Sequence, residues 1–552
     1  MSKRRKRLLI VAAAVIIVGG AAGWYFFLYE PVYPFTISRE TTYLLGPLHA
    51  DGKTLNYVAA LNEMTSRGVT PDNNAAVLVA QALGPEIFDQ KVREQSLKAM
   101  GIGSLTQPGE RFVSLTGYLI ANPPAPVGKT ASGSVSWPRG ASSASARTGP
   151  PPTNDPSVIQ GDNLQAAMKA TWSAQDYPVL ASWLKANDKP LDLLVLAASR
   201  PRWWIPRFSA TEPPATYAAA IFSFGGIRDA CRALTARAML KAGSGRLDEA
   251  WSDLLACHRL NRLLSQGCML IELMLGASGE GSVCAAEHGI AVGGALSASQ
   301  GRQSLADLDA LPVRGDIAGA LSWDRFVALD IIGGAYRQNR GSLRVRQAPP
   351  VGKLPYDFPR INTDWDRAMR VINVWYDRQC QAVRQESFAA RKLAWEDLHG
   401  QASQLLPDDP SLQAKRSGWF IKWFPGQSDE DRWRKQFSRH PGELLVVTRM
   451  PSNVLWLKLP CYAEANFQTT RVAFALAACK AERGRYPESL DALVPEYLKE
   501  MPRDAFVDQP LKYQRQGGGY LLYSVGPNMK DDSGACDWSK EGGPDDVAVI
   551  AK

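Results

Sequence analysis

The chain has 552 residues, of which 45% are hydrophobic and 21% charged, so it can form roughly two to four domains with cores of their own. The formal net charge of +9 includes the cation block Lys3–Arg7, and the remainder is only mildly basic. No long stripe of Lys and Arg is interleaved with aromatic residues, so we expect no nucleic-acid partner.

Residues Leu8–Leu28 carry no charge, and a helix of this length matches a hydrocarbon core of roughly 30 Å. The preceding cations favour a cytoplasmic N-terminus, and the aromatic residues near Tyr29 suit the opposite interface. We therefore predict a single-pass anchor in a bacterial inner membrane, with the bulk of the chain in the periplasm. The small residues Ala21-Ala22-Gly23 leave a cleaved signal peptide as the alternative.

Helical spacing begins after this anchor. Asn56–Met64 and Ala75–Leu83 have apolar residues at helical intervals. The stretch 121–162 is rich in Pro, Ser, Gly and Ala and has few large apolar residues, so we predict a disordered linker or insertion there. Helical periodicity resumes at Leu164–Trp172 and at Tyr177–Leu184.

The segment 217–292 has the strongest helical pattern. The turn Gly243-Ser244-Gly245-Arg246 separates two apolar helices with small residues between them, which predicts a helical hairpin of the tetratricopeptide type. Further on, Asp364–Leu398 is predicted to be one long helix. Its apolar stripe is interpreted as a core face and not as a ligand site. The members of this stripe are Trp365, Met369, Ile372, Tyr376, Val383 and Phe388.

Neither cysteines nor histidines form a local catalytic or metal motif. The eight cysteines are dispersed without a Cys-x-x-Cys pair, so we expect small buried side chains, at most one or two disulfides, and no zinc. The five histidines lack metalloprotease spacing, and neither a Gly-x-Ser-x-Gly motif nor a P-loop is present. The sequence names no catalytic residue. Four residues on adjacent predicted helices could still form an acid–base site: Glu272, Glu280, Glu287 and His288.

The sequence pattern changes from helical to strand-like near the C-terminus. Arg471–Glu482 is predicted to be a helix, followed by three strand-like pieces and a long loop rich in Asp, Asn and Gly. The strand-like pieces are Pro510–Gln514, Gly519–Ser524 and Asp546–Ile550, with glycines between the first two that suit a hairpin.

This C-terminal segment resembles the globular head of type II secretion major pseudopilins. The likeness is carried by Gly484-Arg-Tyr-Pro487, Met501-Pro-Arg-Asp504 and Ser524-Val-Gly526, with Tyr513 and Tyr520 on the hairpin. In that family the last loop holds Ca²⁺, so the resemblance implies a calcium site here. The implied ligands are Asn528, Asp531, Asp532 and Asp537. The apolar helix at the N-terminus lacks the family's Glu, so the likeness concerns the head and not a pseudopilus subunit.

Together these patterns predict a mainly α protein with a small C-terminal α+β domain, a single N-terminal transmembrane helix, a helical-hairpin body and a pseudopilin-like antiparallel sheet. The expected function is a non-catalytic, membrane-anchored scaffold that binds other envelope proteins and is associated with secretion. The alternative is a periplasmic hydrolase with non-local catalytic residues. The predicted regions are the anchor (1–29), a helical segment (30–120), the linker (121–162), the helical body (163–460) and the α+β domain (461–552).

Overall fold

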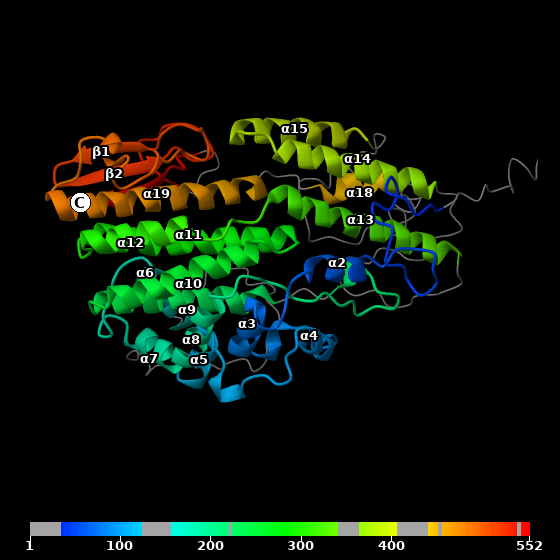
Figure 1. Ribbon diagram of the computed structural model, residues 1–552, viewed down its shortest axis with the longest axis horizontal. Helices are drawn as coiled ribbons and strands as arrows, with labels where there is room; N and C mark the ends of the chain where they lie inside the picture. Colours follow the sequence, from blue (N-terminus) through cyan, green and yellow to red (C-terminus); the bar gives the residue numbers. More distant parts are fainter. Residues whose placement is uncertain are drawn as a thin grey trace, which may run out of the picture. The chain divides into compact units, whose positions relative to one another are not determined.

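The computed structural model describes residues 35–123, 156–219, 223–340, 364–405, 440–450, 455–537 and 543–551, which are mainly helical (Figure 1). The first helices are α2 (Tyr57–Thr65), α3 (Ala75–Leu83), α4 (Arg93–Ala99), α5 (Leu115–Ala121), α6 (Pro156–Ala167), α7 (Pro178–Ala186) and α8 (Asp188–Ala197). The central helices are α9 (Phe224–Gly243), α10 (Leu247–Ser265), α11 (Leu270–Val292), α12 (Ala298–Asp309) and α13 (Ile317–Arg340). The last are α14 (Trp365–Val383), α15 (Phe388–Ser403), α18 (Pro441–Arg449) and α19 (Leu455–Arg483).

The chain divides into two compact units, each made of separate pieces. The smaller unit consists of Met1–Tyr57, Arg325–Asp377 and His399–Ser452, and the larger of Val58–Asp324, Arg378–Leu398 and Asn453–Lys552. Within the smaller unit, the side-chain amide of Asn373 donates to the carbonyls of Glu40 and Thr41, each at 2.8 Å. The N-terminal loop is thus tied to α14 of the same unit.

The larger unit is built from packed helices. Helices α9, α10 and α11 are adjacent in sequence and in space, and α11 also packs on α19 (Figure 1). The predicted hairpin is confirmed as α9 and α10, joined by a turn in which Gly245 has a φ of 78°. A β-carbon at Gly276 of α11 would lie 2.4 Å from the carbonyl oxygen of Asn261 on α10. Only glycine therefore allows these two helices their close approach.

The predicted C-terminal sheet is present. Strands β1 (Lys512–Gln516), β2 (Gly519–Ser524) and β3 (Val547–Ala551) form an antiparallel sheet in the order β1-β2-β3. Helix α19 lies between this sheet and helices α11 and α12 (Figure 1). The inward-facing side chains Tyr520 and Leu522 of β2 are buried against the helix. The sheet thereby buries one face, as a three-stranded antiparallel sheet requires for stability.

One acidic residue fixes the chain before the sheet. The carboxylate of Asp504 accepts hydrogen bonds from the Ser524 hydroxyl at 2.9 Å and from the Val525 N–H at 2.8 Å. Its Oδ1 also accepts from the N–H of Phe506 at 2.9 Å. The Met501-Pro-Arg-Asp504 step of the sequence is therefore the anchor for the end of β2.

The transmembrane part of the expected fold class is corrected. Among the residues that the structure describes, no helix has both the length and the apolar character needed to cross a membrane. Helix α19 has 29 residues but carries charged side chains along its length, including Lys458, Glu464 and Arg471. The expected span, Leu8–Leu28, lies outside the described residues. The fold is thus mainly helical with a small C-terminal antiparallel sheet.

The structure also bears on the expected helix over 364–398, on the expected linker and on the cysteines. The single helix expected over Asp364–Leu398 is wrong, because α14 ends at Val383 and the Ser387 hydroxyl accepts from the N–H of Ala390 (3.1 Å), starting α15 anew. The apolar stripe of that segment is nevertheless buried throughout, as predicted. The predicted linker ends early, since α6 begins at Pro156, and its part 124–155 lies outside the described residues. All eight cysteines are free, and all but Cys536 are buried.

Candidate functional site

Glu272 is separate from the other members of the proposed acid–base group. One of its carboxylate oxygens accepts from Arg207 at 2.6 Å, and both side chains are almost fully buried. The other oxygen accepts from the backbone N–H of Met269 at 3.0 Å, at the start of α11. Glu272 thus caps its own helix and ties it to the loop that carries Arg207.

Glu280 and Glu287 belong to a buried group of charges on α10, α11 and α19 and the loop before α13. Glu280 accepts from Arg262 Nε at 2.8 Å and from Arg314 Nη2 at 2.9 Å. Both guanidinium groups also lie over the ring of Phe467, at 4.4 and 4.8 Å from its centroid. We call this group the charged cluster and define it as His258, Arg262, Glu280, Glu287, Arg314 and Glu464.

His258 lies at the centre of the charged cluster and is fully buried. Its Nε2 is 3.0 Å from both carboxylate oxygens of Glu287, and its Nδ1 is 3.3 Å from Glu280. Burial disfavours a charged ring, but Glu287 and Glu280 outweigh this and raise the pKa of His258 to about 9. At neutral pH both ring nitrogens therefore carry protons and donate. The cluster then holds three cations and three carboxylates and is neutral.

This geometry does not suit acid–base catalysis. A ring with a pKa of about 9 is already protonated near neutral pH and cannot take a proton from a substrate. Burial opposes ionisation of Glu280, but the hydrogen bond from His258 and the charges of Arg314 and Arg262 hold its pKa well below the usual value. His258, Glu280 and Glu287 are at most 1% exposed, so a dissolved substrate has no access to them. The charged cluster joins the helices of the larger unit.

His288 has a different environment from the charged cluster. Its Nε2 lies 2.8 Å from the hydroxyl oxygen of Thr470 on α19, within hydrogen-bond distance. Burial lowers the pKa of His288 to about 4, so the ring is neutral at physiological pH. His288 therefore links α11 to α19. Of the four residues expected to form an acid–base site, the structure brings only Glu280 and Glu287 into one cluster.

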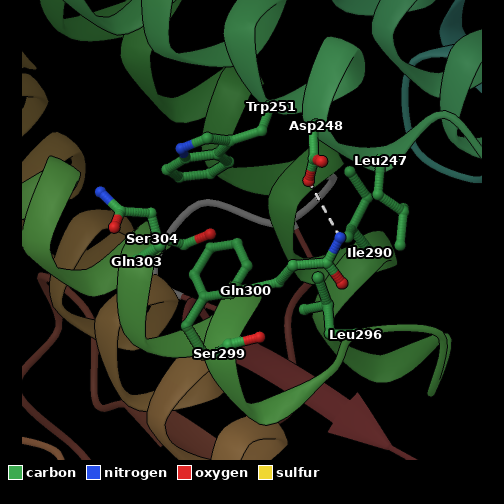
Figure 2. A pocket seen from close by; sticks show the side chains of 10 residues that line it. Leu247, Asp248, Trp251, Ile290, Leu296, Ser299, Gln300, Gln303 and Ser304 are labelled. Carbon is green, nitrogen blue, oxygen red and sulfur yellow. Dashed lines mark hydrogen bonds between the residues drawn. The ribbon is translucent and has the colours of Figure 1, made fainter.

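An open pocket lies beside the α10 N-terminus, next to α12 and α19 (Figure 2). Its volume is about 280 Å³. Its walls combine apolar and polar side chains. The apolar residues are Leu247, Trp251, Ile290, Leu296 and Phe474, and the polar residues are Asp248, Ser299, Gln300, Gln303 and Ser304.

Hydrogen bonds fix the pocket's aromatic wall and its acidic edge. The indole N–H of Trp251 donates to Asp307 at 2.8 Å, and the indole meets the Phe474 ring edge-on at 5.3 Å. The side-chain amide of Gln300 donates to Asp248 Oδ1 at 2.9 Å, the bond drawn as a dashed line in Figure 2. The pocket thus presents an aromatic ring held in place by Asp307 and one lining carboxylate, Asp248.

The acidic C-terminal loop gathers a set of carboxylates different from the expected one. One carboxylate oxygen each from Asp532, Asp545 and Asp546 lie within 4.8 Å of one another. Of the four residues implied by the pseudopilin likeness, only Asp532 belongs to this trio. Asn528 adjoins it, since its side-chain amide donates to Asp532 at 2.7 Å and its backbone N–H to Asp545 at 3.2 Å.

The other two expected ligands have different partners. Asp531 accepts from the hydroxyl of Tyr523 at 2.8 Å and lies 3.6 Å from Lys512 Nζ. The backbone N–H of Asp537 donates to the carbonyl of Pro544 at 2.7 Å. These contacts place both residues in the framework of the loop.

Asp546 is the least satisfied of the trio. It is 1% exposed, and its Oδ2 accepts from the N–H of Gly534 at 2.8 Å. Its Oδ1 has no hydrogen-bond partner among the described residues. Burial and the neighbouring Asp532 and Asp531 raise the pKa of Asp546 to about 6.

Comparisons with protein-family models, with curated proteins and with solved structures find no match for this chain. Three sites therefore remain to be weighed on their geometry. The charged cluster is buried, the acidic loop has one carboxylate oxygen without a hydrogen-bond partner among the described residues, and the pocket beside Trp251 is open to solvent.

Proposed function

We propose that this chain is a non-catalytic interaction protein and that the pocket beside Trp251 receives a basic side chain of a partner protein. The observation that carries the proposal is the pairing of an apolar, aromatic wall with the carboxylate of Asp248. The pocket volume of about 280 Å³ is below the common range for small-molecule sites, about 300–1,000 Å³. A single large side chain suits such a space better than a whole substrate.

The chemistry of the walls selects for a cation with an apolar stem. Lys and Arg bury their methylene groups along apolar surface and keep the charged head in water. Leu247 and Leu296 offer the apolar surface, and the indole of Trp251 offers a face that attracts a cation. Asp248 at the exposed edge supplies the opposite charge. An acidic or purely aliphatic partner side chain gains less from the same walls.

The hydrolase alternative has less support from the same structure. Asp248 is the titratable residue that lines the pocket, and Gln300 already bonds it. The buried carboxylates of Glu280 and Glu287 are paired with cations and are at most 1% exposed. The envelope location and an association with secretion stay predictions from the sequence.

Peptide binding tests the proposed docking. Fluorescence anisotropy would compare decapeptide pools of random sequence that carry Arg, Lys, Glu or Leu at the centre. We expect the Arg and Lys pools to bind wild type most tightly. Asp248→Asn should weaken the binding of these pools about 1.4- to fivefold, since an exposed ion pair contributes about 0.2–1 kcal/mol.

Glu249→Gln is the matched control, because Glu249 adjoins Asp248 in the first turn of α10, is also exposed and does not line the pocket. Both substitutions remove one charge near the same helix N-terminus. Glu249→Gln should leave peptide affinity unchanged. Equal affinity for all four pools, or an equal loss in both variants, would refute docking at this pocket.

We also propose that the acidic loop binds Ca²⁺, as the pseudopilin likeness implies. The residues fit a hard cation, since three carboxylates converge and the buried Oδ1 of Asp546 has no partner among the described residues. Asp532, Asp545 and Asp546 would hold the ion, with Asn528 beside them. Such an ion would neutralise like charges and tie the loop to the hairpin.

A further inference from the structure

Three potential metal ligands of different chemistry converge where Cys284 adjoins His258 and Glu287 of the charged cluster. An Nε2 or Nδ1 of His258, the Sγ of Cys284 and a carboxylate oxygen of Glu287 lie within 4.8 Å of one another. All three residues are 0% exposed. Cys284 and Glu287 are three residues apart on α11, hence on one face of the helix, and His258 meets them from α10.

Zinc accepts each of these three donors. Protein zinc sites combine thiolate sulfur, imidazole nitrogen and carboxylate oxygen at about 2.0–2.3 Å from the metal. Nitrogen and oxygen ligands of a tetrahedral zinc are then about 3.4 Å apart. His258 Nε2 and the Glu287 oxygens are 3.0 Å apart, so a shift of a few tenths of an ångström would admit the ion.

Neighbouring charged groups orient these donors, as the groups around known metal sites do. The Nδ1 of His258 faces Glu280 at 3.3 Å, and a carboxylate at this nitrogen leaves Nε2 as the metal-binding atom. Arg262 and Arg314 in turn fix Glu280. Burial and the charges of Glu287 and Glu280 raise the pKa of the Cys284 thiol well above its usual value, so the thiol keeps its proton until a metal ion displaces it.

We propose that His258, Cys284 and Glu287 bind one zinc ion inside the larger unit. One N–Zn, one S–Zn and one O–Zn bond form, and the protons of the His258 ring nitrogen and of the Cys284 thiol leave to solvent. Two protons are exchanged for one divalent cation, so the neutral charge of the cluster is unchanged. The sequence does not predict this site, because its ligands come from two helices and none belongs to a Cys-x-x-Cys pair.

Metal analysis of the full chain tests the site. The protein would be refolded with Zn²⁺, because buried ligands are reached during folding, then dialysed and measured by inductively coupled plasma mass spectrometry. We expect about one zinc per chain. Refolding with Co²⁺ should give a thiolate-to-cobalt charge-transfer band in the near ultraviolet, which carboxylates alone cannot produce.

Cysteine variants show which thiolate gives rise to the cobalt charge-transfer band. Cys284→Ser should remove it, and Glu287→Gln should shift it and weaken zinc retention at least tenfold. The control is Cys257→Ser, which is equally buried but whose thiol faces the Cys231 carbonyl at 3.5 Å. That variant should keep the band. Folded wild type without bound zinc, or a band that survives Cys284→Ser, would overturn the proposal.

Discussion

Replacing Gly276 by alanine should destabilise the larger unit, because α10 and α11 are in direct contact there. An added β-carbon would lie 2.4 Å from the Asn261 carbonyl oxygen and 2.8 Å from the Ser265 β-carbon. Overpacking of this kind costs about 1–3 kcal/mol. The better helix propensity of alanine returns about 1 kcal/mol. We therefore expect a net loss of roughly 0–2 kcal/mol in the free energy of unfolding.

Gly281→Ala in the same helix is the matched control. A β-carbon there would have the Asn466 side chain as its nearest neighbour at 3.9 Å, so nothing has to move. That variant should gain about 0.5–1 kcal/mol from helix propensity alone. Urea unfolding followed by circular dichroism would give both values. If Gly276→Ala is as stable as Gly281→Ala, the close crossing of α10 and α11 is wrong.

Three further predictions concern charged groups. Glu280→Gln should lower the free energy of unfolding by about 3–5 kcal/mol, because it leaves buried cations without their carboxylate, whereas Glu464→Gln at a half-exposed position should cost far less. Burial and the charge of Arg337 lower the pKa of His49 to about 4. Between about pH 6.5 and pH 4, His49 is therefore protonated in the unfolded chain and neutral in the folded chain. Stability should therefore fall as the pH drops from about 6.5 to about 4, by up to about 3 kcal/mol, and His49→Gln should remove that part of the slope. Saturating Ca²⁺ should raise the melting temperature of the full chain above its value in chelator. At a hundredfold excess over Kd, the free energy of unfolding should rise by about 2–3 kcal/mol. Asp532→Asn should abolish this rise, and the adjacent Asp531→Asn should retain it.

Each of these has a result that would contradict it. Equal losses in the two Glu variants would mean that Glu280 is not the buried hub of its cluster. A pH slope that persists unchanged in His49→Gln would assign it to other groups. Identical melting in Ca²⁺ and in chelator would reduce the acidic loop to a solvated turn.

Local sequence signals predicted some elements at their observed bounds. Helix α3 begins after Asn74, whose side chain accepts from the N–H of Ala76, and ends at Gly84 with a φ of 88°. Both ends have residues with a strong conformational preference, so Ala75–Leu83 could be predicted without tertiary information. Strand β2 follows a glycine turn and was predicted over the same residues for the same reason.

Other features depend on contacts that the sequence does not reveal. Helix α19 runs through Pro460, because Trp456, Leu457 and Cys461 are buried around it, and this burial offsets the lost hydrogen bond. The charged cluster also escaped prediction, since its members are up to 206 positions apart, from His258 to Glu464. The available signal was a pair of polar residues, His258 and Arg262, one helical turn apart within the buried face of α10.

The most direct test of the proposed function is a double-mutant cycle between the pocket and its ligand. Isothermal titration calorimetry would measure the affinity of wild type and Asp248→Asn for one selected peptide with arginine at its centre. The same peptide with citrulline has nearly the same shape without the charge. Docking of a basic side chain predicts a coupling energy of about 0.2–1 kcal/mol between the arginine and Asp248. A coupling of zero, with arginine and citrulline bound equally well by wild type, would contradict it.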